Sequence, residues 1–223
     1  MQLITEQQGT PARPVAPTVS VPQKETPAAA KRGRDAGPEP GEAPEQKKNR
    51  TAPALPRVVQ IWTDGSHIKG TDRTGFGIYA RAGSKEGEVS VSASQEYLCK
   101  ILGVVVDSPT AASNPTLELA AAIVALRRVQ QHVDTIDRAV LYADYIGVIN
   151  YANNVWDAHN ASPRTPMFAK AARLLQETVR DLRKKIHVDA VWVRGHSGDP
   201  GNERADSLAK ARSGVDTLGR IFE

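Results

Sequence analysis

The sequence has 223 residues, a formal net charge of +4 and a single cysteine, Cys99. This length allows one sizeable domain with extensions or two small domains, and one cysteine excludes a framework of intramolecular disulfides. No apolar run approaches the ~20 residues that span a bilayer, and the N-terminus lacks the basic-then-apolar layout of a secretory signal. We therefore expect an intracellular protein without a membrane partner.

Residues 1–57 differ in composition from the rest of the chain. They hold ten of the fifteen prolines and no aromatic residue, so they cannot bury enough apolar surface to offset the entropy of ordering. We expect a disordered tail over 1–57, a folded domain over 58–215 and a C-terminal extension over 216–223. Basic clusters at 31–34 and 47–50 are a weak nuclear signal, loose phosphate contacts or a solvated linker, so nuclear and cytoplasmic locations both stay open.

The folded part is predicted to begin with a hairpin. Residues 58–64 are largely apolar and β-branched, which indicates a buried strand that ends in an acid, and after a polar turn 75–80 predict the returning strand. A third strand is expected within 88–106. Two runs, 89–94 and 96–106, compete for it, and periodicity does not separate them.

The rest of the folded part alternates helices with strands. We expect, in order, a buried helix (116–129), a strand (139–144), a short helix to about 153, an amphipathic helix (166–185), a strand (186–193) and a closing helix (204–212) capped by Asn202. Three strands in a meander followed by this alternation indicate an α/β fold, with a mixed sheet and helices packed on its faces.

Four acids stand where regular elements end or begin. Asp64 and Asp144 end apolar strands, whereas Glu118 and Asp206 lie at the starts of helices. In α/β sheets the ends of adjacent strands gather at one edge, where ligands bind. Four carboxylates there would repel one another unless divalent cations neutralise them, and all-oxygen ligands favour Mg²⁺, with Mn²⁺ as a substitute. Two such ions about 4 Å apart form the clamp used for displacement at phosphorus.

Each acid also has an ordinary explanation. Asp64, followed by Gly65, is compatible with a turn, and Glu118 and Asp206 are compatible with charges that the helix dipole favours. Asp144 is harder to explain in this way, because it directly ends a run too apolar to favour a charge.

A glycine-rich loop carries a histidine next to the last acid. Three glycines and a proline between 195 and 201 break regular structure, and His196 lies among them. The following helix presents Asp206 near its start. This arrangement places a proton-handling or metal-handling group beside a carboxylate.

Together these motifs resemble ribonuclease H. They are Thr63-Asp64-Gly65-Ser66, Asn114 with Leu117-Glu118-Leu119-Ala120, Tyr142-Ala143-Asp144, and Gly195-His196-Ser197-Gly198 through Asn202-Glu203-Arg204-Ala205-Asp206. The match runs from about 58 to 212 in the family's order. The last motif is the most specific, and it is also similar to ribonuclease H domains of retroelements.

The resemblance implies a ribonuclease H-like fold with a five-stranded mixed sheet flanked by helices. It implies an endonuclease that hydrolyses the RNA strand of RNA–DNA hybrids by a two-metal-ion mechanism, leaving 5′-phosphate and 3′-hydroxyl ends. By analogy, Mg²⁺ is bound by Asp64, Glu118, Asp144 and Asp206, and His196 assists water activation or product departure.

The resemblance also implies which residues bind the hybrid. Asn114 would contact the minor groove, where 2′-hydroxyls are displayed, and Gly65 and Ser66 would let the backbone approach the RNA strand. We expect the enzyme to act as a monomer.

Two other functions remain open from the sequence. A DNA-acting nuclease of the same fold, similar to a resolvase or integrase, is one, although such proteins typically lack the motif from His196 to Asp206. A catalytically inactive nucleic-acid-binding relic is the other, although all four acids and the histidine are present. One departure from the family is that 145–147 read Tyr-Ile-Gly, where polar residues often touch the substrate.

Overall fold

The computed structural model describes residues 57–68, 71, 73–105, 113–159 and 165–223. The expected tail up to residue 56 and both basic clusters lie outside these residues. Arg57, the last residue assigned to that tail, is held by Asp137, whose carboxylate accepts from the Arg57 backbone N–H at 2.7 Å and from its guanidinium at 3.0 Å. No helix in the described ranges is long and apolar enough to cross a membrane.

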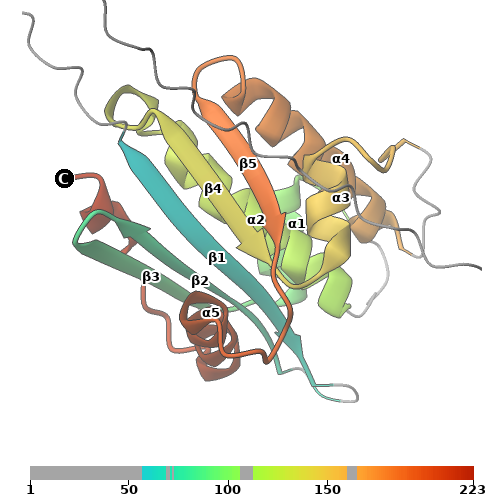
Figure 1. Ribbon diagram of the computed structural model, residues 1–223. Coiled ribbons are helices and arrows are strands. Elements are labelled where there is room, and N and C mark those ends of the chain that lie inside the picture. Colours follow the sequence, from blue (N-terminus) through green and yellow to red (C-terminus); the bar gives the residue numbers. More distant parts are fainter. Residues whose placement is uncertain (1–56, 69–70, 72, 106–112, 160–164) are drawn as a thin grey trace, which may run out of the picture. The chain divides into compact units, whose positions relative to one another are not determined.

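Five strands form one mixed sheet in the order β3-β2-β1-β4-β5 (Figure 1). The strands are β1 (Val58–His67), β2 (Thr74–Ala82), β3 (Lys85–Ser92), β4 (Arg138–Ala143) and β5 (His187–Trp192). The first three pair antiparallel through short turns, whereas β1, β4 and β5 run parallel and are joined by helical crossovers. The expected five-stranded mixed sheet is confirmed.

The third strand contains only the first of the two competing runs. β3 covers most of 89–94 but starts four residues before it, whereas the run 96–106 holds the helix α1 (Gln95–Leu102). The Ser94 hydroxyl accepts a hydrogen bond from the Tyr97 N–H, and Gly103 ends the helix in the left-handed conformation with φ 63°. A serine cap and a glycine stop therefore favour a helix over the strand that the apolar residues allowed.

The remaining helices follow the predicted order. They are α2 (Asn114–Gln130), α3 (Ile146–Ala152), α4 (Pro166–Leu182) and α5 (Pro200–Ala211), with short 3-10 helices at Val133–Thr135 and Leu218–Ile221. The start of α5 differs from the prediction. Asp199 caps it by accepting from the Asn202 N–H at 2.8 Å, because Pro200 suits the first helical position. The prediction of Asn202 as the cap was wrong, and its side chain is free for another contact.

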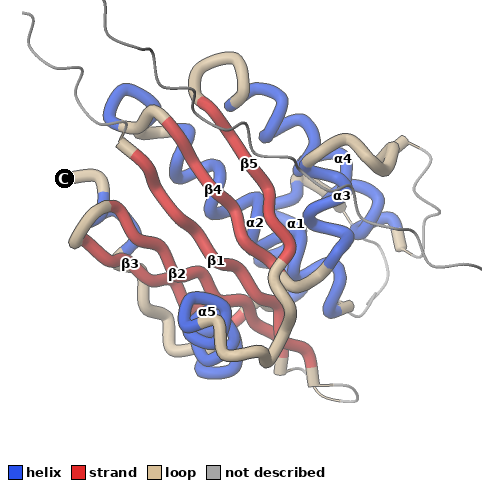
Figure 2. Tube along the Cα trace, in the orientation of Figure 1, coloured by secondary structure: helices blue, strands red, loops and turns tan. Residues whose placement is uncertain are grey.

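Two glycines show which helix covers which face of the sheet. Asp64 pairs with Gly77, so both point to one face, while Gly65 points to the other. A Cβ on Gly77 would lie 2.1 Å from the Ala205 carbonyl oxygen in α5, and one on Gly65 would lie 2.8 Å from Leu117 Cβ in α2. Hence α5 covers one face alone, with α1 to α4 behind the sheet (Figure 2), and Asp64 points to the α5 side.

The main core lies between the sheet and α2, which packs on β1 and against α4. Every residue of α2 from Thr116 to Ile123 is buried, as predicted for a helix with apolar residues on most of its sides. Glu118 is the single charged residue in that stretch. A charge in such a position is costly unless something neutralises it.

The segment 216–223 packs on the sheet next to β3. A Cβ on Gly87 would lie 2.9 Å from Leu218 Cα, and both Leu218 and Ile221 are buried. The backbone of Asp216 also forms an isolated antiparallel β-bridge with Val89. The expected C-terminal extension therefore contributes apolar side chains to the core.

Replacement of Gly77 by alanine tests the packing of α5. The new methyl group would meet backbone atoms, Ala205 O at 2.1 Å and Ala209 N at 2.5 Å, which cannot move without displacing the helix. We expect Gly77→Ala to lower the free energy of unfolding by about 1–3 kcal/mol, measured by urea denaturation. Gly219→Ala is the matched control, because nothing lies within 4 Å of its Cβ position, and it should be nearly neutral. Equal stability of the two variants would contradict this packing.

Candidate active site

Three of the four predicted acids meet at one end of the sheet. Thr63 pairs with Ala143 in the parallel strands β1 and β4, so the following residues, Asp64 and Asp144, are neighbours. Glu118 lies in the second turn of α2 and not, as was predicted, at its start. This helix approaches β1 closely because the residue after Asp64 is Gly65. One carboxylate oxygen from each of Asp64, Glu118 and Asp144 lies within 4.8 Å of the other two.

Burial and mutual repulsion perturb two of these acids strongly. Asp64 and Glu118 are each 7% exposed. Burial, and then the charges of Asp144 and Asp206, raise the pKa of Asp64 to about 7. Burial, and then the charges of Asp64 and Asp144, raise the pKa of Glu118 well above its usual value. The Gly65 backbone N–H opposes both shifts by donating to these carboxylates.

The donor set fits a hard divalent cation. All three groups are carboxylates, which Mg²⁺ and Mn²⁺ prefer to nitrogen or sulfur ligands. One carboxylate oxygen of Glu118, Oε2, is buried and has no hydrogen-bond partner. A buried carboxylate oxygen without a partner is costly, and a cation between the three acids would remove both this cost and the repulsion.

Asp144 is held by residues that the sequence did not single out. The Asn202 side-chain amide donates to Asp144 Oδ2 at 3.3 Å, and the Trp192 indole donates to the Asp144 carbonyl at 2.9 Å. Gly195 lies so close that a Cβ there would be 2.7 Å from Asp144 Oδ2. The spacing of Asn202 four residues before Asp206, one turn of α5, was the available signal, but Asn202 was interpreted as a cap.

Asp206 stands beside the three acids but is not one of the group. It lies in α5, is partly buried, and contributes to the raised pKa of Asp64. Its carboxylate accepts from the Lys210 ammonium at 2.6 Å, one helical turn further on. The fourth predicted acid is therefore near the site and already paired with a cation of the chain.

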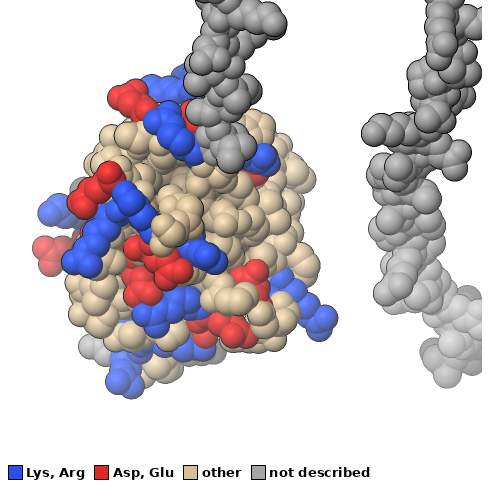
Figure 3. All heavy atoms as spheres, turned by 60° about the vertical axis from the view of Figure 1, so that its left-hand side comes forward, with Lys and Arg blue, Asp and Glu red and all other residues tan. Residues whose placement is uncertain are grey.

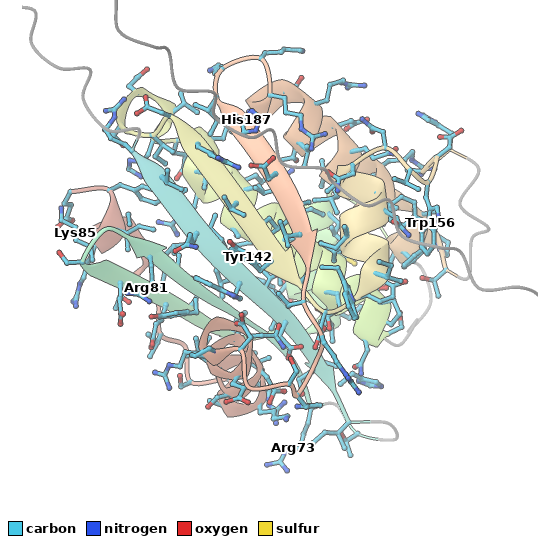
Figure 4. All side chains as sticks on the ribbon, in the orientation of Figure 1. Arg73, Arg81, Lys85, Tyr142, Trp156 and His187 are labelled. Carbon is cyan, nitrogen blue, oxygen red and sulfur yellow. The ribbon has the colours of Figure 1, made fainter. Side chains whose placement is uncertain are left out.

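Three aromatic rings set the position of α5 on the sheet. Trp62 stacks on Tyr142 with ring centroids 4.9 Å apart and is tilted against Tyr79 at 5.6 Å. Gly201, in the first turn of α5, lies against the Trp62 ring, where a Cβ would be 2.2 Å away. Tyr142 stands in the middle of this sheet face (Figure 4). This contact fixes the helix that carries Asn202 and Asp206.

His196 lies in the loop that joins β5 to α5. Its side chain is exposed, and its backbone adopts a left-handed conformation with φ 51°, which is uncommon for a residue other than glycine. The preceding residue, Gly195, is the one that contacts Asp144. His187, by contrast, pairs with Asp189 at 3.1 Å and belongs to the opposite end of β5.

The three predicted substrate-binding residues lie around the acids. Asn114 is exposed at the start of α2, with Ser113 as the cap, and Glu118 is one turn later. Ser66 is half-buried in β1. The ordinary explanation of Asp64 and Gly65 required a turn at this point. Gly65 lies instead within a strand, because β1 continues to His67. A side chain on Gly65 would collide with α2, so the packing of this helix requires a glycine here whether or not the residue contacts a substrate.

Acidic and basic residues are nearly balanced in number from residue 58 onward. Without residues 1–57, the chain has 20 Lys and Arg against 19 Asp and Glu, and Figure 3 shows the two kinds interspersed over one face. Several form pairs, such as Arg204 with Glu88 at 2.6 Å. The described domain therefore offers only local cationic contacts to a polyanion.

Comparison with known proteins decides the family. The family model of RNase H matches residues 56–213. The chain belongs to the ribonuclease H family. Ribonuclease H of Bordetella pertussis is 30% identical over 157 residues, 68% of this chain and 86% of that protein. Ribonuclease H of Cupriavidus necator is 30% identical over 164 residues, 73% of this chain and 98% of that protein.

Solved structures of ribonuclease H domains also match. RNase H1 from the halophilic archaeon Halobacterium salinarum gives a TM-score of 0.47 at 20% identity, covering 70% of this chain and 96% of that one. LC9-RNase H1, described as a type 1 RNase H with the type 2 active-site motif, gives 0.49 at 21% identity, covering 75% and 78%. The family model and the two bacterial relatives confirm the predicted family, and with it a nuclease with a group of acids suited to metal binding.

The raised pKa of Asp64 predicts how the metal-free ribonuclease H domain responds to pH. With a folded pKa of about 7 against about 3.9 unfolded, the folded protein holds a proton that the unfolded chain has already released. The free energy of unfolding in EDTA should therefore fall as pH rises from about 4 to 8, by a few kcal/mol at about 1.4 kcal/mol per unit.

The comparison with Asp64→Asn isolates this group. The variant should be the more stable protein at pH 8 and should lose the advantage near pH 4, as measured by thermal unfolding. A constant difference between the two proteins across this range would show that Asp64 is not perturbed.

Proposed function

We propose that this chain is an endonuclease that hydrolyses the RNA strand of RNA–DNA hybrids with two Mg²⁺ ions, leaving 5′-phosphate and 3′-hydroxyl ends. The observation that carries the proposal is the convergence of Asp64, Glu118 and Asp144, from three separate elements, within 4.8 Å. A shared site of this kind in a ribonuclease H domain is hard to explain as three independent surface charges, since two of the acids are buried.

The acids would act in the proposed chemistry by holding the metal ions. Bound divalent ions would supply a nucleophilic water at neutral pH and stabilise the charge on the phosphate oxygens. Asp64, Glu118 and Asp144 would hold these ions, and Asp206 would complete the set from α5. Asn202 keeps the Asp144 carboxylate in place through its side-chain amide.

The residues around the acids would bind and orient the hybrid. Asn114 is exposed one turn before Glu118, where its amide can both donate to and accept from a ribose 2′-hydroxyl. The 2′-hydroxyl is the group that distinguishes RNA from DNA at such a contact. Gly65 and Ser66, at the end of β1, would let the backbone approach the RNA strand closely.

Substitution of the acids tests the metal site. Asp64→Asn and Asp144→Asn should each abolish cleavage of a labelled RNA–DNA hybrid in Mg²⁺, because either change removes a ligand. The fold should persist, and Asp64→Asn should be stabilised without metal, because one crowded charge is removed. Near-normal turnover by both variants would overturn the assignment.

The substrate is tested in the same assay. Wild-type protein should cut the hybrid in Mg²⁺ and leave duplex RNA and duplex DNA intact. Cutting of duplex DNA would favour the resolvase-like alternative, and no cutting of any substrate would favour a binding relic.

His196 is proposed to assist the reaction by moving a proton or easing product departure. Its exposed position on the loop gives it no role in the core. Because proton-transfer assistance is typically worth about 10²–10⁴-fold, His196→Ala should lower kcat by about that factor, spare some activity and leave hybrid affinity nearly unchanged. Wild-type turnover by His196→Ala would remove this residue from the mechanism.

A further inference from the structure

Asp206 differs from the other three acids in having a cation of the chain as its partner. The Lys210 ammonium lies 2.6 Å from Asp206 Oδ2, and the side chains are 58% and 23% exposed. The positive charge also reaches the acid cluster, since Lys210 lowers the pKa of Asp64 against the larger effects of burial and neighbouring acids. A second divalent ion would use the Asp206 carboxylate as a ligand. The Lys210 ammonium already occupies a position beside that carboxylate.

This pair is not equivalent to an ordinary pair on a helix surface. Most exposed pairs between residues four apart contribute little, because water screens both charges. Here one partner is largely covered and stands beside two buried acids, where screening is weaker. A lysine at this point therefore competes with a metal ion for the same carboxylate and repels any ion that enters.

We propose that Lys210 is a positioning residue that acts through Asp206: by holding the fourth carboxylate, its ammonium weakens the binding of the second divalent ion. The fourth carboxylate would then bind an ion only at a higher Mg²⁺ concentration than it would without the lysine. This inference rests on the proposed function, because it concerns the metals of the same site.

Removal of the lysine should strengthen metal binding. Lys210→Met keeps the length of the side chain and deletes its charge, which frees Asp206 and removes the repulsion. One unit charge at such a distance from a doubly charged ion is expected to change affinity by about tenfold. Lys210→Arg retains the charge and should bind metal as the wild type does.

The experiment is a titration of the full-length protein with Mg²⁺ alone at pH 8, without substrate, followed by calorimetry and by the rise in Tm. Lys210→Met should reach half-saturation of the weaker site at about one tenth of the wild-type Mg²⁺ concentration. Combined with Asp206→Asn, the lysine substitution should cause a much smaller change, because the part of its effect that acts through the Asp206 carboxylate is lost.

Lys184→Met is the matched control. Lys184, just after the end of α4, pairs with Asp181 of that helix at 2.7 Å. It stands shortly before β5, whose first residue pairs with the first residue of β4. It therefore lies at the opposite end of the sheet from the acids, and its removal should leave Mg²⁺ binding unchanged.

The outcomes separate this inference from the proposed function. Wild-type Mg²⁺ binding that is lost in Asp144→Asn, together with unchanged binding in Lys210→Met, would overturn only the role of Lys210. An effect of Lys210→Met that is undiminished in the Asp206→Asn background would do the same. Absence of Mg²⁺ binding by the wild type would overturn the metal site and this inference together.

Discussion

Repulsion between carboxylates in a partly buried site is the interaction on which the rest of this structure depends. Asp64 and Glu118 are buried, and burial together with the nearby charge of Asp144 raises the pKa of both carboxyl groups. A folded domain accepts such a group only if the surrounding packing is strong enough to offset the cost. The sheet and the buried first half of α2 supply that packing, so the stability of the core supports an arrangement that would otherwise separate.

The fold also holds these acids on elements that cannot easily move apart. Asp64 and Asp144 are fixed by the pairing of β1 with β4, and Glu118 is fixed by the approach of α2 to Gly65. The fourth acid is placed differently. The position of Asp206 is set by α5, which packs on the face of the sheet opposite to α2. Its contacts there are with Gly77 and, through Gly201, with the ring of Trp62. Three acids therefore lie on rigid elements and the fourth on a separately packed helix, which would give the two metal sites of the proposed mechanism unequal affinities.

Local sequence patterns predicted most elements and failed where two signals competed. The strand before Asp64 and the buried helix around Glu118 followed from apolar periodicity. The choice of 89–94 or 96–106 as the third strand was left open, because apolar periodicity did not separate the two runs. The cap and stop at Ser94 and Gly103 decide in favour of the helix. At α5 the signal of Asn202 was misassigned, since Asp199 followed by Pro200 is the stronger start.

The sequence alone determined the family, the order of strands and helices and the acids at their ends, because these depend on local periodicity and on motifs with fixed spacing. Only the tertiary structure decided which acids share a site, since that depends on strand register and on helix packing between distant segments. It brought Asp64, Glu118 and Asp144 together and assigned the Asn202 amide to Asp144. The pairing of Asp206 with Lys210 is local, since the two residues are one helical turn apart, but the packing of α5 on the sheet decided that this pair lies beside the acids.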